Sequence, residues 1–378
     1  MKKVLFVTGT RADYGKIKPL MKEVLNLEDY ELQIFVTGMH MLSKYGSTHL
    51  ELEKDGFGNL YKYINQTDST SMDLVLSNTI LGISNYVNEY KVDLIVVHGD
   101  RVEALAGAIV GALNNIRVAH VEGGEVSGTI DESIRHAISK FSHIHFVANE
   151  EAKKRLIQLG EETSNVYIIG SPDIDIMLSN QLPGIDKVKE RYGIPFDDYA
   201  VLMYHPVTTE VEQMKEKIKE VVDAVIESSR NYIVIYPNND NGSSDILNEY
   251  KRFSKCTNIK IYPSIKFEYF LSMLKHAKFM IGNSSAGIRE AGIYQVPAID
   301  IGSRQNGRYS SRSKGIVHSE EAKDEILSCI KDIDKTREFL VDGQSEYGDG
   351  KSSMRFMEIL KGNDIWKCEI QKKFIDVE

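Results

Sequence analysis

The chain has 378 residues and a net charge of −9, with 42% hydrophobic residues. This length predicts two domains rather than one core, and the acidity excludes a broad nucleic-acid-binding surface but not a local phosphate site. The three cysteines lack metal-binding spacing, and no run approaches the ~20 apolar residues of a membrane span, so we expect a cytoplasmic protein with reduced thiols and neither metal nor membrane contact.

The first half of the sequence alternates short apolar runs with amphipathic stretches. Runs rich in Val and Ile predict strands over residues 4–8, 32–37, 94–98, 118–122, 145–148 and 166–170. Helical periodicity is found over residues 16–27, 72–89, 102–113, 130–140 and 150–159. This alternation predicts a parallel sheet that is covered by helices on both faces.

The pattern pauses in a predicted linker, residues 171–199, and then restarts. Further strands are predicted over residues 201–204, 232–236, 259–262, 279–281, 298–301 and 316–317. We therefore predict an α/β protein with two doubly wound, Rossmann-like domains, residues 1–175 and 176–354, that face each other across a cleft. A C-terminal helix over about residues 355–378 is expected to pack back onto the first domain.

In open α/β sheets, ligands bind beyond the carboxyl ends of the strands, so the loops there are the most informative segments. The loop after the first strand, residues 8–15, contains Arg11, and Gly9 and Gly15 permit a tight turn before a helix. A helix N-terminus with a nearby arginine suits phosphate. The loop lacks the P-loop and dinucleotide-binding glycine patterns, and an ordinary turn with a surface arginine is an equal interpretation.

A second predicted anion site follows the strand at residues 279–281. Ser284, Ser285 and Gly287 allow the backbone to approach a diphosphate and add hydroxyl donors. Glu290 follows at the start of a helix, where its carboxylate can accept hydrogen bonds from ribose hydroxyls. The alternative is an ordinary helix cap with an acidic first turn.

Acidic residues gather at the ends of two strands in the first half. Asp100 follows one strand and Glu122 ends the next, so both side chains can project into one site. Several carboxylates in one site push their pKa values apart, which allows one to act as acid and another as base. Surface pairs and helix caps are the alternative for any single carboxylate. Nearby residues that can share this site are Arg101, Asp131, Glu132 and Arg135.

Three loops of the second half carry further polar candidates. His205 ends a strand and can protonate or hydrogen-bond a diphosphate leaving group. Asn238 follows the next strand and can contact a base or sugar, or belong to a turn. Arg304 and Arg308 follow a late strand and are possible phosphate ligands.

Taken in order, these motifs resemble the hydrolysing UDP-N-acetylglucosamine 2-epimerases of sialic acid synthesis. The resemblance rests on Gly-Thr-Arg-Ala-Asp at 9–13, His-Gly-Asp-Arg at 98–101, His-Val-Glu-Gly-Gly-Glu at 120–125, Asp-Glu-Ser-Ile-Arg-His at 131–136, His-Pro at 205–206, Gly-Asn-Ser-Ser at 282–285 and Gly-Ser-Arg-Gln at 302–305. Non-hydrolysing relatives carry an arginine-rich run after the histidine, where this chain has Pro-Val-Thr, which favours the hydrolysing branch.

The resemblance implies a fold like that of the B-type glycosyltransferases, with UDP held mainly by the second domain. It implies no cofactor, a UDP-sugar as the partner molecule, and a homo-oligomer (dimer or tetramer). The residues that match the family's catalytic positions are Asp100, Glu122, Asp131, Glu132 and His205. Those that match nucleotide contacts are Arg11, Ser284, Ser285, Glu290 and Arg304.

The resemblance further implies a reaction that removes the C2 proton while UDP leaves, and that then hydrates the resulting glycal. Three alternatives stay open at this stage. One is a sister epimerase acting on a UDP-2,4-diacetamido-2,4,6-trideoxyhexose in legionaminic acid synthesis. The second is a glycosyltransferase of the same architecture, and the third is a non-catalytic UDP-sugar sensor. The residues also leave open which of Asp131 and Glu132 transfers the proton.

Overall fold

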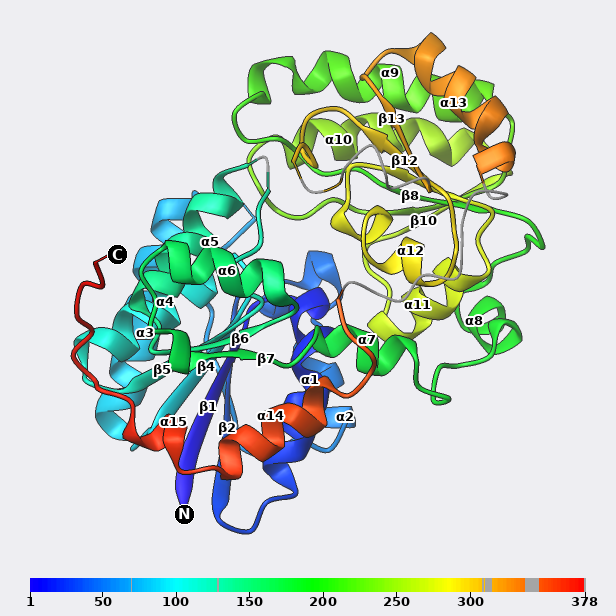
Figure 1. The fold of residues 1–378 in the computed structure, drawn as a ribbon. Coiled ribbons are helices and arrows are strands. Elements are labelled where there is room, and N and C mark those ends of the chain that lie inside the picture. The colour runs from blue at the N-terminus through cyan, green and yellow to red at the C-terminus, as the bar shows by residue number, and fades with distance from the viewer. Residues whose placement is uncertain (69, 128, 308, 310–314, 337–346, 377–378) are drawn as a thin grey trace. The chain divides into compact units, whose positions relative to one another are not determined.

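The computed structural model describes residues 1–68, 70–127, 129–307, 309, 315–336 and 347–376 (Figure 1). The chain forms two compact units. The first comprises Met1–Glu125, Asp131–Ser179 and Ser345–Glu378, and the second comprises Val126–Ile130 and Asn180–Gln344. Both units are doubly wound α/β structures, so the predicted fold class is confirmed.

The first unit is built on a seven-stranded parallel sheet in the order β3-β2-β1-β4-β5-β6-β7. Its strands are β1 (Lys2–Thr8), β2 (Tyr30–Val36), β3 (Leu60–Lys62), β4 (Leu94–His98), β5 (Arg117–Val121), β6 (Ile144–Val147) and β7 (Val166–Ile168). The sequence did not predict β3, because three partly exposed residues at a sheet edge are too short to show a period.

Helices cover both faces of this sheet (Figure 1). Side chains of α1, α14 and α15 enter one apolar core, and those of α3, α4 and α5 enter the other. The helices of the unit are α1 (Arg11–Leu25), α2 (His49–Lys54), α3 (Met72–Glu89), α4 (Val102–Leu113), α5 (Ile130–Phe141), α6 (Glu150–Gln158), α7 (Pro172–Met177), α14 (Ser352–Lys361) and α15 (Asp364–Lys367).

The second unit has a six-stranded parallel sheet in the order β10-β9-β8-β11-β12-β13. Figure 1 shows α9, α10 and α13 on one face and α11 and α12 on the other. Its strands are β8 (Ala200–Met203), β9 (Tyr232–Ile235), β10 (Ile259–Tyr262), β11 (Met280–Gly282), β12 (Ala298–Ile301) and β13 (Ile316–Ser319). Its helices are α8 (Ile185–Tyr192), α9 (Met214–Glu227), α10 (Ser243–Tyr250), α11 (Phe267–Lys275), α12 (Glu290–Ile293) and α13 (Lys323–Thr336).

The strand orders show where each sheet can bind a ligand. The direction of winding reverses between β1 and β4 in the first unit and between β8 and β11 in the second. Loops that leave neighbouring strands on either side of such a reversal diverge, and this leaves a crevice at the carboxyl edge. The polar loops that follow β1, β4, β8 and β11 are therefore the ones at the two crevices.

The structure corrects three details of the predicted elements. Helix α1 begins at Arg11, so Gly15 lies inside the helix and takes no part in a turn. The predicted linker contains α7 and α8. In place of one helix over residues 355–378, α14 ends at Lys361, the four-residue α15 follows, and residues 368–376 are not helical.

The segment after residue 347 nevertheless belongs to the first unit. The Phe356 ring lies 5.0 Å from the ring of Phe146 and is fully buried. Arg117 donates to the carbonyl of Trp366 at 2.6 Å. Among the residues that the structure describes, no helix is sufficiently long and apolar to cross a membrane.

Replacement of Phe356 by alanine tests how much α14 stabilises the first unit. We expect Phe356→Ala to lower the free energy of unfolding by about 3–5 kcal/mol, because a buried aromatic ring leaves a cavity. Trp366 is the single tryptophan of the chain and packs on this core, so its fluorescence during urea unfolding reports on the first unit. Phe374 is 89% exposed, and Phe374→Ala is the control that should change little. Equal effects of both variants would contradict this account.

Candidate active site

The loop after β1 is held by one buried carboxylate, that of Asp13. Thr10 caps α1 by accepting the backbone N–H of Asp13 at 3.1 Å, and Asp13 accepts the N–H of Thr10 at 3.3 Å in return and that of Gly9 at 2.9 Å. The hydroxyl of Thr8 also donates to Asp13. Burial is the largest influence on this carboxyl and raises the pKa of Asp13 to about 6. The capping box therefore fixes the loop around a group that titrates near neutral pH.

A fully buried histidine extends this network. His40 Nε2 lies 3.0 Å from the Thr8 hydroxyl and Nδ1 lies 2.6 Å from the Thr48 hydroxyl. Burial lowers the pKa of His40 to about 3, so the ring is neutral. Because Thr8 gives its proton to Asp13, the Nε2–H of His40 donates to Thr8 and Thr48 donates to Nδ1. His40 is thus a structural member of the loop network.

Arg11 is the first residue of α1 and forms an ion pair with Glu51 of α2. Its guanidinium lies at the helix N-terminus, where the sequence predicted an anion site. The structure therefore pairs this predicted nucleotide contact with a carboxylate of its own unit, and a role in phosphate binding stays a prediction.

Gly99 links the ends of β4 and β5. It adopts a left-handed backbone with φ of +74°, and its N–H donates to the carbonyl of Val121 at 3.0 Å. The His120 ring lies between the carbonyl of Gly99, 2.8 Å from Nε2, and the hydroxyl of Ser139, 3.0 Å from Nδ1. Burial lowers the pKa of His120 to about 3, so a neutral ring donates to Gly99 and accepts from Ser139. These bonds bring Asp100 and Glu122 to one sheet edge.

Asp100 is paired with a buried cation. Arg135 of α5 forms an ion pair with the Asp100 carboxylate and donates to the carbonyl of Glu125 at 3.0 Å. Burial alone would lower the pKa of Arg135, but Asp100 and neighbouring carboxylates reverse this and raise it. The guanidinium is 3% exposed, so this charge is held in place by its partners.

Glu122 lies directly after β5 in an uncommon conformation. Its φ is +64°, in the left-handed region that residues other than glycine rarely adopt, and the residue is 5% exposed. Ser171 donates from its hydroxyl to Glu122 Oε1. His98 Nε2 lies 3.2 Å from Oε2, although the ring is not aligned for a hydrogen bond. Backbone strain of this kind is often found at functional sites, and a catalytic role for Glu122 stays a prediction.

The two glycines after Glu122 are required by their neighbours. A Cβ on Gly123 would stand 2.8 Å from Nδ1 of His120. Gly124 has a φ of +77°, and a Cβ there would stand 2.3 Å from the carbonyl oxygen of Ala152. The close packing around His120 and α6 therefore leaves no room for a side chain at either position after Glu122.

The two other acids that the sequence predicted as catalytic are less enclosed. Asp131 and Glu132 lie in the first turn of α5, and both are partly exposed. Glu132 faces His136 at 3.7 Å along the same helix. Arg101 Nε lies 3.8 Å from the buried carboxylate of Glu103, which packs against Gly9. The structure does not distinguish Asp131 from Glu132 as a proton-transfer group.

His205 of the second unit is oriented by hydrogen bonds from two other loops. The N–H of Asn238 donates to His205 Nδ1 at 3.0 Å, so the ring proton is on Nε2. Asn283 accepts the N–H of His205 at 2.6 Å and donates to its carbonyl at 2.8 Å. The loops after β8, β9 and β11 are thereby joined, with a histidine Nε2–H donor at their centre.

The glycine-serine loop after β11 lies beside these groups. Gly282 has a φ of +127°, and a Cβ there would stand 2.0 Å from the carbonyl oxygen of Met203, so only glycine fits. Ser284 caps the 3₁₀ helix at Ser285–Gly287 by accepting the N–H of Ala286 at 3.3 Å. The capping interpretation therefore holds for Ser284, and it does not exclude a ligand at the same helix start.

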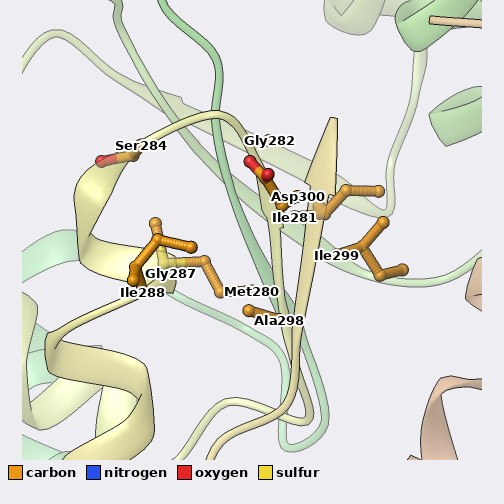
Figure 2. Close-up of a pocket in the computed structure, with 9 residues that line it drawn as sticks. All are labelled: Met280, Ile281, Gly282, Ser284, Gly287, Ile288, Ala298, Ile299 and Asp300. Atoms are coloured by element: carbon orange, nitrogen blue, oxygen red, sulfur yellow. The ribbon is translucent and has the colours of Figure 1, made fainter. Parts of the chain in front are cut away.

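A small pocket lies beneath this loop (Figure 2). Most of its surface is apolar, and the buried carboxylate of Asp300 accepts a hydrogen bond from Tyr309 at 2.7 Å. The predicted residue Gly287 is part of its wall. The pocket is lined by Met280, Ile281, Gly282, Ser284, Gly287, Ile288, Ala298, Ile299 and Asp300.

Two residues after β12 also reach the β11 loop. Gln305 donates to the carbonyl of Asn283 at 2.7 Å, and Arg304 approaches the same oxygen at 3.4 Å. Glu290 begins α12 and is 3% exposed. Arg308 lies outside the residues that the structure describes.

The structure thus brings Asp100, Glu122 and Arg135 together in the first unit, and His205, Asn238, Ser284 and Arg304 to one sheet edge in the second. Sequence reasoning assigned no role to several residues that orient these groups. They are Asp13, His98, His120, Ser171, Asn283 and Gln305. Most lie inside the quoted motifs, but Ser171 had no signal except its place after a strand of the same sheet. Within the described residues, no cluster of three or more His, Cys, Asp or Glu side chains could hold a metal ion.

Comparison with known proteins shows which family and which solved structures this chain resembles. A family model described as UDP-N-acetylglucosamine 2-epimerase matches residues 22–361. A protein of Neisseria meningitidis named UDP-N-acetylglucosamine 2-epimerase is 48% identical over the full length of both chains. The Legionella pneumophila UDP-N,N'-diacetylbacillosamine 2-epimerase (hydrolyzing) is 35% identical, with 96% of each chain covered.

A third relative, the polysialic acid biosynthesis protein P7 of Escherichia coli, is 33% identical over 100% of this chain and 98% of its own. Among solved structures, a Neisseria meningitidis UDP-GlcNAc 2-epimerase bound to UDP-GlcNAc superposes with a TM-score of 0.79 at 18% identity, covering 95% of this chain and 99% of that one. At that identity the likeness supports the fold.

Asp13 leads to a prediction on stability and pH. Since burial raises its pKa from 3.8 to about 6, the folded chain holds a proton that the unfolded chain releases between these values. This group's contribution to stability is therefore lost as the pH rises through about 6. The unfolding free energy of Asp13→Asn minus that of the wild type should rise by about 1–2 kcal/mol from pH 5 to pH 7.5. Urea unfolding followed by Trp366 fluorescence measures it.

The exposed Asp73 provides the control for this measurement, because its pKa is lowered by the hydrogen bond from Ser71 and lies below the range that is scanned. Asp73→Asn should show no such rise. A constant difference between wild type and Asp13→Asn over this pH range would contradict the assignment.

Proposed function

Because this chain belongs to the UDP-N-acetylglucosamine 2-epimerase family, we propose that it is a hydrolysing 2-epimerase. It converts UDP-N-acetylglucosamine and water into N-acetylmannosamine and UDP. The observation that carries this proposal is the pair of carboxylates at the ends of β4 and β5, Asp100 and Glu122, which have different partners at one sheet edge. Such a pair supports two distinct proton-transfer roles.

Two features favour hydrolysis over return of the nucleotide sugar. The Legionella pneumophila relative is named as hydrolyzing and is 35% identical over nearly the full length. The sequence after His205 is Pro-Val-Thr, in place of the arginine-rich run of non-hydrolysing relatives. The polysialic acid biosynthesis relative supports a place in sialic acid synthesis.

The proposed reaction begins with elimination. A carboxylate takes the proton from C2, the C1–oxygen bond to the diphosphate breaks, and the electron pair of the C2–H bond forms the C1–C2 double bond of a glycal. We assign this step to Glu122, whose two oxygens contact Ser171 and His98 at the end of β5. The C2 proton of a hexose is weakly acidic, so departure of UDP must accompany its removal.

Hydration completes the proposed reaction. C2 receives a proton from a carboxylic acid on the face opposite to the one that lost it, which inverts the centre. Water adds its oxygen to C1 and gives up one proton to a carboxylate of the site, so the proton count balances. We assign the protonation of C2 to Asp100, with Asp131 or Glu132 as a further acid–base partner. Arg135 would stabilise the ionised form that Asp100 takes once it has given its proton to C2.

The second unit would bind UDP. His205 presents an Nε2–H donor, since its Nδ1 accepts from Asn238. We assign this donor and the cations Arg11 and Arg304 to the departing diphosphate, where positive charge stabilises the transition state. Ser284 and Ser285 would contact the phosphates, and Glu290 the ribose.

One other substrate is favoured by a specific observation. The 35% identical relative is named for UDP-N,N'-diacetylbacillosamine, a 2,4-diacetamido-2,4,6-trideoxyhexose derivative. The same carboxylates can act on C2 of either sugar, because the two differ at C4 and C6. The relative kcat/KM for the two nucleotide sugars decides between these substrates.

Proton NMR of the purified protein with UDP-N-acetylglucosamine in deuterated water tests the proposal. We expect free N-acetylmannosamine with deuterium at C2, together with UDP. Glu122→Gln and Asp100→Asn should each lower kcat by about 100-fold or more, because general acid–base groups typically contribute 10²–10⁴-fold.

Gln213→Glu is a matched control. It exchanges a carboxamide for a carboxylate, the reverse of the change in Glu122→Gln, at a residue outside the proposed site. It should retain wild-type turnover. Release of UDP-N-acetylmannosamine in place of free sugar would contradict hydrolysis, and a product without deuterium at C2 would contradict the proton exchange.

A further inference from the structure

The carboxylate of Glu122 is enclosed on two sides by groups to which the proposed reaction gives no role. Oε1 accepts the hydroxyl of Ser171, and Oε2 lies 3.2 Å from Nε2 of His98. Ser171 is fully buried, and the side chains of His98 and Glu122 are 8% and 6% exposed. A hydroxyl that donates to one oxygen of a carboxylate restricts its rotation, so the bond from Ser171 helps to set the plane of the Glu122 carboxylate.

Ser171 is itself firmly held within the first unit. Its N–H donates to the carbonyl of Tyr347 at 2.6 Å, and its own carbonyl accepts the hydroxyl of Ser352 at 3.0 Å. Asp175 in turn caps α14 by accepting the N–H groups of Ser352 and Ser353 at 2.8 and 2.7 Å. The serine therefore belongs to a rigid junction between the start of α7 and the start of α14.

The backbone of Glu122 limits the other degrees of freedom. Its N–H donates to the carbonyl of Phe146 at 2.9 Å, which keeps the residue against β6 while φ stays at +64°. The backbone is thus fixed from β6, and the two oxygens are contacted by Ser171 and His98, which restricts the orientation of the side chain. Proton transfer to or from carbon requires such an orientation, because a misplacement of about 1 Å can cost ~100-fold in rate.

We propose that Ser171 is a positioning residue that holds the Glu122 carboxylate for proton transfer at the sugar C2, with His98 confining its second oxygen. The proposal rests on the proposed function for the identity of the reacting carbon. It adds that the geometry of the base depends on a hydroxyl 49 residues away in sequence, at the junction of α7 and α14.

The test compares Ser171→Ala with Ser171→Thr, which keeps the hydroxyl. Ser171→Ala should lower kcat by about 10- to 100-fold, with KM changed by less than about threefold, since the substrate contacts remain. Ser171→Thr should recover most of the lost rate. Ser142→Ala is the matched control, because Ser142 is also fully buried and donates to a carbonyl, that of Ile138 at 2.8 Å.

A double variant separates positioning from a general loss of structure. In the Glu122→Gln background, Ser171→Ala should cause little further loss of kcat, because the group that it orients has already lost its function. Additive losses would overturn the proposal, as would a wild-type kcat in Ser171→Ala or an equally impaired Ser171→Thr.

A crystal structure of Ser171→Ala keeps this proposal testable whatever the substrate proves to be. A changed or multiple orientation of the Glu122 carboxylate is expected. An unchanged, single orientation would overturn the positioning role, whereas absence of UDP release by the wild-type enzyme would contradict the proposed function alone.

Discussion

The polar groups of the first unit depend on the cross-link that Gly99 makes between β4 and β5. Its N–H reaches the carbonyl of Val121, and its carbonyl accepts from the neutral ring of His120. Only a residue without a side chain takes a φ of +74° at low cost, so this link requires glycine. Because the link ties the two strand ends together, Asp100 and Glu122, which follow them, must lie at one sheet edge.

The two carboxylates are placed in different electrostatic environments. Asp100 faces the buried guanidinium of Arg135, and a charge that is taken out of water is stable only with such a partner. Glu122 contacts a hydroxyl and an imidazole, and its backbone is held in an uncommon conformation. This difference would be the physical basis for the separate acid and base roles that we propose, because similar carboxylates in similar surroundings would compete for the same proton.

The second unit resembles the first in topology, but the loops at its carboxyl edge carry different polar residues. Its loops at the winding reversal carry histidine, asparagine and serine, and the hydrogen-bond donors that they offer suit an anionic group. The backbone N–H of Asn238 fixes the tautomer of His205, and Asn283 joins two loops by a reciprocal pair of bonds. One sheet topology thus carries the proposed acid–base residues in one unit and the proposed anion-binding residues in the other, since function is carried by the loops and not by the strands.

The sequence by itself determined the two parallel sheets, because continuous apolar runs of Val and Ile separated by helical periods have few other solutions. It also indicated the loops after β1, β4, β5, β8, β11 and β12, because glycine, histidine, serine or charged residues lie at or just after the ends of those strands. Only the tertiary structure decided that Arg11 pairs with Glu51 and that Gly15 lies within α1. It alone brought Ser171 to Glu122, since contacts between distant segments depend on how the strands are ordered and how α14 returns to the first sheet, and no local pattern records that order.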